Sequence, residues 1–331
     1  MQTFILRRLI IGIVILFVLS VTVFLLMRIV PGDPAIRRCG LDCTKPKIAQ
    51  IHKDLGLDKP YFPVELRRGP PFVSFSSDSQ YGTYMSSILT GDLGTSTFNQ
   101  KPVGPQVIDR MPVTIEIMVL TLIFTIIVGI PFGALSAVFR NSPIDYVVRS
   151  TSVLGLAVPS FWVATLVLVI PSDLWGYAPI IGRKVSLIND PIGNFKQVAP
   201  AAAVLALGSA AGVMRLTRSS LLEVMRQDYM RTARAKGLTQ SAVVIRHGLK
   251  NSMIPVVTVL GLQVSGLLGG AIIVEQIFTL PGLGLFTLQA LLAKDYDVVQ
   301  TMTLYAGATV VLLNLLVDVS YAWLDPRIRY S

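Results

Sequence analysis

Side chains that could do acid–base, nucleophilic or metal chemistry are few in this 331-residue chain, and they lie far apart. The chain contains two histidines, His52 and His247, and two cysteines, Cys39 and Cys43. A membrane-embedded enzyme needs a paired nucleophile and base, or several metal ligands at membrane depth. Both histidines lie outside the long apolar runs of the sequence, so we expect no catalytic residue and no bound metal.

The two cysteines lie in a long segment that we expect on the exported side of a membrane, where disulfides are chemically permitted. A bond between Cys39 and Cys43 would close a very small ring, and free thiols are the alternative. Neither His52 nor a nearby carboxylate completes a persuasive metal site.

Recognition of another protein is favoured by the polar segment 215–255. Residues 228–237 predict one short helix, because an acidic residue stands at its positive end, basic residues follow, and Gly237 provides the C-terminal stop. Thr239 can cap a second short helix, and Pro255 opens the next apolar run. A short helix of this kind suits the groove of a partner protein. The alternative is an amphipathic helix that lies among lipid headgroups.

One face of this predicted helix carries Tyr229, Ala233 and Lys236, at the spacing i, i+4, i+7, with Thr232 beside them. The face is small, and the arginines that flank it could pair with an acidic partner. We therefore expect this face to be the docking face.

The elements that position these residues are apolar helices. Only 15% of the residues are charged, against roughly 25% in a soluble domain. A bilayer needs about 20 consecutive apolar residues per span. Six runs satisfy this: 9–29, 113–138, 152–170, 198–214, 254–274 and 302–324. The fourth run is the weakest, being short and rich in alanine and glycine, and Pro159 with Ser160 predicts a kink in the third.

Lysine and arginine gather in alternate loops, which places both termini in the cytoplasm and segment 31–112 outside. We therefore divide the chain into a first transmembrane helix (1–30), an exported loop or small subdomain (31–112) and a five-helix core (113–331). A short helix is expected around residues 46–56. The net charge of +10 is explained by this membrane asymmetry, so we expect lipid and no nucleic acid as a partner.

Polar groups within or beside the spans are candidates for a transport path. We assign Ser160, Ser209, Gln263 and Ser265 to its lining and Glu275 to an outer gate, although a solvated acid at the membrane surface is an equal alternative for Glu275. Small residues at helix-packing spacing, such as the glycine pair in the second run at 129 and 133, favour close packing of helices. A proton-coupled secondary transporter is the competing class, but it needs more buried ionisable groups than the spans supply.

The segment 233–238, with the later His247 and Pro255, resembles the cytoplasmic glycine motif of binding-protein-dependent ABC importer permeases. Most members of that family have Glu-Ala-Ala before the glycine, whereas here Thr232 stands at the glutamate position and Arg234 at the second alanine. This pattern is similar to the dipeptide/oligopeptide/nickel branch. Further fragments resemble that branch in the same order: MRIVPGDP at 27–34, LGLDKP at 55–60, GDLGTS at 91–96, RMPVT at 110–114, VEQIF at 274–278, PGLG at 281–284 and DPRIR at 325–329.

The resemblance implies an all-α membrane protein with six transmembrane helices, in the type I (MetI-like) importer fold with a long exported loop. It implies a non-catalytic permease that works with a homologous second permease, two cytoplasmic ATPase subunits and an extracytoplasmic substrate-binding protein. The chain shows no G-x-x-x-x-G-K-[ST] loop, so ATP and Mg²⁺ would be held by the partner ATPases, with no cofactor on this chain. The residues implied in ATPase coupling are Tyr229, Thr232, Ala233, Arg234, Ala235, Lys236, Gly237 and Leu238.

The same resemblance implies a bacterial or archaeal cytoplasmic membrane as the location. It implies di- or oligopeptides as the most prevalent solutes, with nickel, glutathione or oligosaccharides as alternatives within the branch.

Overall fold

The structure, a computed structural model, describes residues 2–29, 34–39, 44–54, 56–66, 73–75, 78–177 and 181–324. The chain separates into two compact units. The first unit comprises Met1–Leu9, Arg110–Phe286 and Thr309–Ser331, and the second comprises Ile10–Asp109 and Thr287–Ala308. Four helices run through the boundary between the units, and each unit is described below by itself.

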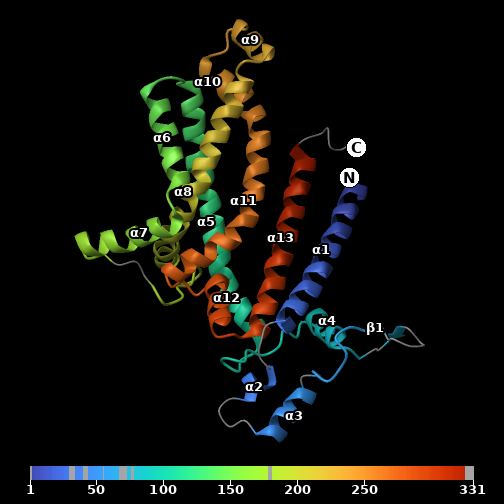
Figure 1. The fold of residues 1–331 in the computed structure, drawn as a ribbon. Helices are drawn as coiled ribbons and strands as arrows, with labels where there is room; N and C mark the ends of the chain where they lie inside the picture. The colour runs from blue at the N-terminus through green and yellow to red at the C-terminus, as the bar shows by residue number, and fades with distance from the viewer. Residues whose placement is uncertain are drawn as a thin grey trace. The chain divides into compact units, whose positions relative to one another are not determined.

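The described residues are almost entirely helical (Figure 1). The elements are α1 (Gln2–Ile29), α2 (Pro34–Cys39), α3 (Lys45–Asp54), β1 (Val64–Leu66), β2 (Val73–Phe75), α4 (Gln80–Thr90), α5 (Val103–Val138), α6 (Pro143–Ala157), α7 (Ser160–Trp175), α8 (Pro191–Val224), α9 (Asp228–Ala235), α10 (Gln240–Ala242), η1 (Val243–Leu249), α11 (Lys250–Ile277), α12 (Leu283–Leu292) and α13 (Tyr296–Leu324).

Five helices among the described residues are long and apolar enough to cross a membrane. They are Leu6–Ile29, Val103–Val138, Pro191–Val224, Gln240–Gly269 and Tyr296–Val317. The predicted third span, 152–170, is wrong as a single helix, because α6 and α7 meet within it at a 100° bend. The bend lies at Val158–Pro159, where proline disfavours helical backbone in the residue before it, as the sequence predicted. If the bent pair counts as one span, the described residues hold up to six.

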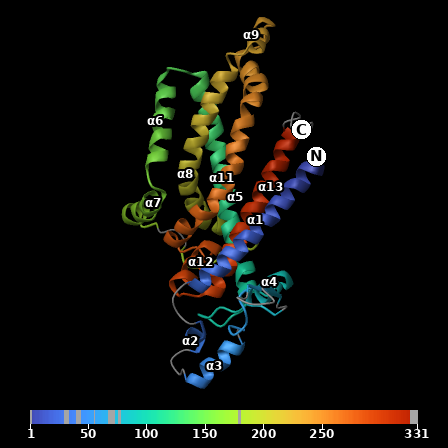
Figure 2. The same ribbon diagram turned by 45° about the vertical axis from the view of Figure 1, so that its right-hand side comes forward.

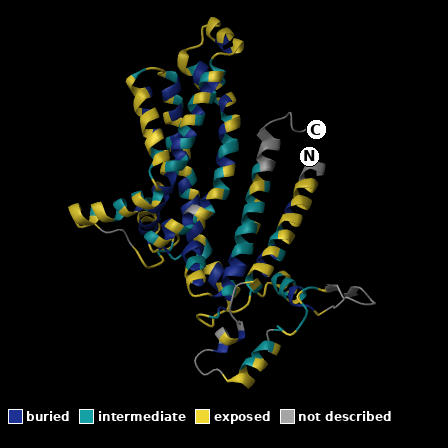
Figure 3. Cartoon of the chain, viewed as in Figure 1, coloured by how far each residue is buried: buried dark blue, intermediate teal, exposed yellow. Residues whose placement is uncertain are grey.

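The fourth run, which the sequence analysis ranked as the weakest, forms the candidate span with the largest buried share. Helix α8 extends well beyond the predicted 198–214, and its apolar window is 61% buried, against 39% for that of α5. It packs against α6, α7 and α11, and buried residues concentrate along these contacts (Figures 2 and 3). Alanine and glycine reduce hydropathy, but they also let neighbouring helices approach closely, so the same composition that weakens the signal produces the burial.

The glycine pair of α5 is the clearest case of this packing. A Cβ atom at Gly129 would lie 2.7 Å from Val213 Cγ1, and one at Gly133 would lie 2.6 Å from the carbonyl oxygen of Met214. Both distances are shorter than side chains tolerate, so the prediction of close helix packing is confirmed at these positions. By contrast, a Cβ at Gly266 in α11 would meet nothing within 4 Å.

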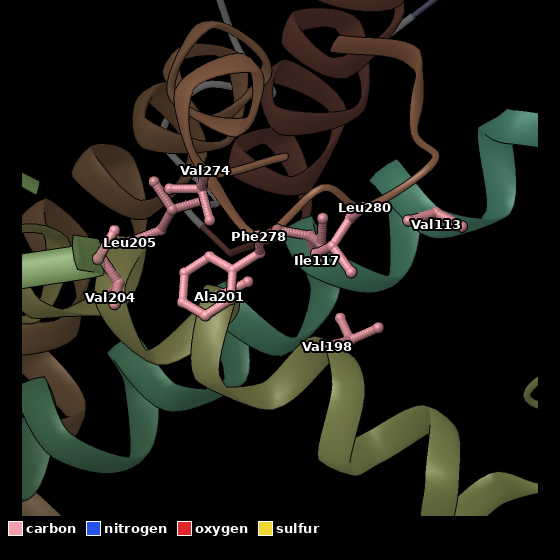
Figure 4. Close-up of a cluster of buried hydrophobic side chains, with 10 residues drawn as sticks. Val113, Ile117, Val198, Ala201, Val204, Leu205, Val274, Phe278 and Leu280 are labelled. Carbon is pink, nitrogen blue, oxygen red and sulfur yellow. The ribbon is translucent and has the colours of Figure 1, made fainter. Parts of the chain in front are cut away.

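A hydrophobic cluster joins four helices of the first unit, α5, α7, α8 and α11 (Figure 4). Helix α5 provides Val113 and Ile117, and the end of α11 with the turn after it provides Phe278, whose ring lies beside Ala201 of α8 in Figure 4. The further members are Ala164, Val198, Val204, Leu205, Val274 and Leu280.

The second unit is organised around aromatic side chains. Phe24 of α1 is 0% exposed and makes edge-on contacts with Tyr81 of α4 and with Phe62, at centroid distances of 5.3 and 5.7 Å. The hydroxyls of Ser20 and Tyr81 are 2.8 Å apart and hydrogen-bonded. The predicted short helix at 46–56 is confirmed as α3. The two-stranded antiparallel sheet of β1 and β2, which pairs Val64 with Phe75, and helix α4 were not predicted.

Two other features differ from the sequence expectations. Pro255 does not open a span, because it lies inside α11, which continues η1 without a break. The segment 275–301, which lies between the fifth and sixth predicted runs, contains α12, an apolar helix of ten residues that is too short to cross a bilayer.

Candidate functional site

Helix α9 lies at one end of the bundle that α5, α6, α8 and α11 form in the first unit (Figures 1 and 2). It begins at Asp228, whose carboxylate stands in the first turn, and ends at Ala235. Gly237 has φ +78°, a left-handed conformation that only glycine adopts without strain, and its N–H donates to the Arg234 carbonyl at 3.0 Å. The predicted helix and its glycine stop are confirmed.

The buried face of α9 differs from the expected one. Met230 is 0% exposed and Ala233 is 7% exposed, and both pack against Val243 of η1 and the end of α8. Ala233 therefore belongs to the face that holds the helix on its own chain, and its predicted place on a docking face with Tyr229 and Lys236 is wrong. The cause is a tertiary contact: η1 folds back on α9 and covers one side of it.

The opposite face of α9 is open to solvent. Tyr229, four residues before Ala233, lies at the border between the two faces: it is 42% exposed, and its hydroxyl accepts a hydrogen bond from Asn251 Nδ2 of α11 at 3.0 Å. Arg231 lies 3.6 Å from Asp228, with both side chains largely exposed. The other exposed residues of this segment are Thr232, Arg234, Ala235, Lys236, Gly237 and Leu238. This face is short, mostly polar and rich in positive charge, so it suits a partner surface that carries acidic groups.

A buried ion pair fixes the helix that leads into α9. Asp145 of α6 is 0% exposed, and its two carboxylate oxygens accept hydrogen bonds from Arg218 Nε at 2.8 Å and Nη2 at 2.9 Å. Ser136 Oγ and the backbone N–H of Asn141 complete its shell, at 2.5 and 2.9 Å. The sequence analysis missed this pair, although Asp145, three residues after the helix cap Ser142, carried a local signal.

Three of the four residues assigned to a transport path come together. Ser160, Ser209 and Gln263 line one cavity of about 350 Å³, formed by α6, α7, α8 and α11 of the first unit. Gln263 Nε2 donates to the Ser209 carbonyl at 3.4 Å, and Gln263 Oε1 is buried without a hydrogen-bond partner among the described residues. Ser265 lies apart from this cavity and is hydrogen-bonded to Asn314 instead, at 3.1 Å. The Gln263 carbonyl oxygen can therefore accept a hydrogen bond from a donor group that enters this cavity.

Glu275 is enclosed by its own chain. Its side chain is 0% exposed and accepts hydrogen bonds from the Thr114 hydroxyl at 2.6 Å and the Leu285 N–H at 2.8 Å. A solvated acid at the membrane surface is therefore wrong. The assignment to an outer gate stays a prediction, and the contacts show that the carboxylate binds the first turn of α12.

The cysteines and metal ligands give less information. Cys39 ends α2 and is buried, whereas Cys43 lies outside the described residues, so their disulfide stays a prediction. Among the residues that the structure describes, no group of three or more histidine, cysteine or carboxylate side chains is arranged to hold a metal ion.

Solved structures and sequence relatives agree on the class of this fold. The MetNI methionine ABC transporter in an inward-facing conformation matches with a TM-score of 0.55 and 17% identity, over 66% of this chain and 96% of that one. At this identity the likeness concerns the fold alone, and it confirms the expected type I importer permease fold.

Relatives of higher identity span the whole chain. The dipeptide transport system permease protein DppB of Escherichia coli (strain K12) is 38% identical over 356 residues, with 100% of both chains covered. The oligopeptide transport system permease protein AppB of Bacillus subtilis (strain 168) is 36% identical over 334 residues, again with 100% of both covered.

Two family models together match most of the chain. The model of the binding-protein-dependent transport system inner membrane component matches residues 129–330, and the model of the N-terminal part of such membrane components matches residues 1–118. The chain thus belongs to the family of binding-protein-dependent transport system inner membrane components.

Proposed function

We propose that this chain is the membrane-spanning permease subunit of an ATP-driven importer of di- or oligopeptides. The relatives that match its full length carry out dipeptide and oligopeptide transport by name, which supports this class of solute. In this proposal a homologous second permease, two ATPase subunits that hold ATP and Mg²⁺, and a substrate-binding protein complete the transporter. The chain itself is a permease component and not a catalyst.

The observation that carries the proposal is the construction of α9. One face is anchored by Met230 and Ala233, and the other is exposed at the end of the bundle. The pair of Asp145 and Arg218 ties α8, which leads directly into α9, to α6. A displacement applied to the exposed face would therefore be passed to packed transmembrane helices instead of being absorbed by a loose loop. This is the behaviour that ATPase coupling requires.

The orientation follows from the same assignment. The positive-inside rule puts α9 and both termini in the cytoplasm of a bacterial or archaeal cell. The cavity lined by Ser160, Ser209 and Gln263 then lies along the transport path. Alternating packing of the surrounding helices would open this cavity first to one side of the membrane and then to the other.

The experiment is ATP-driven uptake of a radiolabelled dipeptide into proteoliposomes that contain the co-expressed transporter. Thr232→Tyr adds bulk to the exposed face of α9, where the Thr232 hydroxyl bonds only the Asp228 carbonyl. Thr165→Tyr is the matched control, because Thr165 is an exposed threonine of α7 with the same type of bond, to the Phe161 carbonyl.

We expect both variants to reach the membrane and to co-purify with ATPase subunits as the wild type does. Thr232→Tyr alone should lose uptake and peptide-stimulated ATP hydrolysis. Wild-type uptake by Thr232→Tyr would refute α9 as the coupling element. A transporter that works as a lone homo-oligomer, driven by a proton gradient, would refute the importer.

A further inference from the structure

The cavity of about 350 Å³ in the first unit meets a solute with uncharged groups. Helices α6, α7, α8 and α11 enclose it, and its polar side chains are Ser160, Ser209 and Gln263. The other described residues of the lining are apolar residues and glycines. A solute in this cavity therefore meets hydrogen-bonding groups and apolar surface from this chain, and no charge.

The orientation of the Gln263 amide is set by α8. Its Nε2 donates a hydrogen bond to the Ser209 carbonyl at 3.4 Å. A backbone carbonyl can only accept, so the amide nitrogen must face it, and Oε1 is left for another partner. In the described part of the chain Oε1 is buried and has no such partner. An unsatisfied buried acceptor lowers the stability of a fold, so this oxygen points to a ligand and not to packing.

Two glycines of the lining keep space open beside this amide. Gly266 lies three residues after Gln263, on the same side of α11, and a Cβ there would meet nothing within 4 Å. A Cβ at Gly208 of α8 would lie 3.6 Å from the Gly155 carbonyl oxygen, which is an ordinary contact. Neither glycine has a positive φ. Unlike the glycine pair of α5, these two are required neither by helix packing nor by the backbone, and their missing side chains leave room for a bound group.

We propose that Gln263 determines solute specificity in the transport path, by accepting a hydrogen bond from a donor group of the passing solute. In a dipeptide that donor is an N–H group, which belongs either to the peptide bond or to the terminal ammonium. The hydroxyls of Ser160 and Ser209 can donate or accept and so adapt to the neighbouring polar atoms of the solute, whereas Oε1 can only accept. The identification of the solute as a peptide rests on the proposed function, but the unpaired acceptor and the open space beside it do not.

The test is ATP-driven uptake of three radiolabelled solutes into proteoliposomes that contain the assembled transporter. Dialanine carries both kinds of N–H donor. Alanyl-lactate has an ester oxygen in place of the peptide N–H, and N,N,N-trimethyl-dialanine has methyl groups in place of the ammonium hydrogens. The measured quantity is the preference for dialanine over each analogue, compared between the wild-type and variant permeases. The substrate-binding protein is the same in every sample, so its own preference cancels in this comparison.

Four variants separate the acceptor from the space around it. Gln263→Met removes the amide oxygen and keeps the length of the side chain, and Gln263→Leu repeats the comparison with a second apolar side chain. Gln276→Met is the matched control, because Gln276 is an exposed glutamine of the same helix outside the lining of the cavity. Gly266→Leu fills the open space and leaves the acceptor in place.

We expect both Gln263 variants to lower the preference for dialanine over one analogue by about five- to tenfold, which is the contribution of one hydrogen bond. The affected analogue is alanyl-lactate when Oε1 binds the peptide N–H, and the trimethylated dipeptide when it binds the ammonium. Gln276→Met should keep the wild-type preference. Gly266→Leu should slow the uptake of all three solutes alike, because it obstructs the cavity without changing its acceptor.

Wild-type preferences of the Gln263 variants against both analogues would overturn the inference, and so would an equal loss of uptake for all three solutes. Gln263 variants that fail to assemble would show that the residue acts in the fold, which overturns the inference as well. The absence of dialanine uptake by the wild-type transporter would instead contradict the proposed function, so the two failures are distinguishable.

Discussion

Replacing Glu275 tests whether a buried carboxylate holds the turn between α11 and α12. The Thr114 hydroxyl donates to Glu275 and accepts from the Leu283 N–H, at 2.6 and 2.8 Å, while the Leu285 N–H donates to the second carboxylate oxygen at 2.8 Å. The two side chains therefore satisfy N–H groups of the first turn of α12, which have no partner within the helix. Gly282 lies so close that a Cβ there would overlap the carboxyl group.

The magnitude follows from this inventory of donors. Glu275→Ala leaves the Thr114 hydroxyl and the Leu285 N–H buried without their acceptor, at about 1–3 kcal/mol each, so we expect a loss of about 3 kcal/mol or more. Glu275→Gln retains the shape and one acceptor oxygen. Its NH₂ group can face Thr114 only by donating to it, so the hydroxyl loses its acceptor, and we expect a loss of about 1–2 kcal/mol.

The assay is denaturant titration of the detergent-solubilised protein, followed by tryptophan fluorescence. Glu223→Gln is the control, because Glu223 is an exposed carboxylate of α8, and its replacement should change the free energy of unfolding by less than about 0.5 kcal/mol. A wild-type midpoint for Glu275→Ala, or equal losses for the alanine and glutamine variants, would refute the reasoning that acceptor capacity is what Glu275 supplies.

Three further predictions concern α8 and α9. Asp145→Asn breaks the bidentate pair with Arg218 and should lower the free energy of unfolding by about 2 kcal/mol or more, in the same titration; an unchanged midpoint would contradict a structural role for the pair. Gly133→Ala places a Cβ 2.6 Å from a backbone carbonyl of α8 and should lose about 1–3 kcal/mol, whereas Gly266→Ala, with open space around its Cβ, should lose nothing; equal midpoints would refute the packing argument. Gly237→Ala forces a side chain into a left-handed conformation that disfavours the helix stop by about 1–2 kcal/mol, so hydrogen exchange of the α9 amides should accelerate, and unchanged exchange would show that the stop is not needed.

The local signals in the sequence predicted α9 well. The acidic first turn, the basic end and Gly237 all act within one helix, so their spacing is enough to place both ends of it. The buried face of α9 was mispredicted, because it depends on the contact with η1. The residues 228–237 alone do not determine how η1 packs against α9. The burial of α8 was underestimated from the sequence. Its alanine and glycine residues lowered the hydropathy of the run, but the same small residues allow the close packing that buries the helix.

What the sequence determined by itself is the class of the protein and the positions of its long apolar helices, because hydropathy and helix stops are local properties of consecutive residues. The bend between α6 and α7 was also visible, as a proline. Only the tertiary structure joined Asp145 to Arg218, 73 residues apart, enclosed Glu275 beside Thr114, and brought Ser160, Ser209 and Gln263 to one cavity. These contacts depend on how helices far apart in the chain pack together, and residue spacing along the chain does not contain that information.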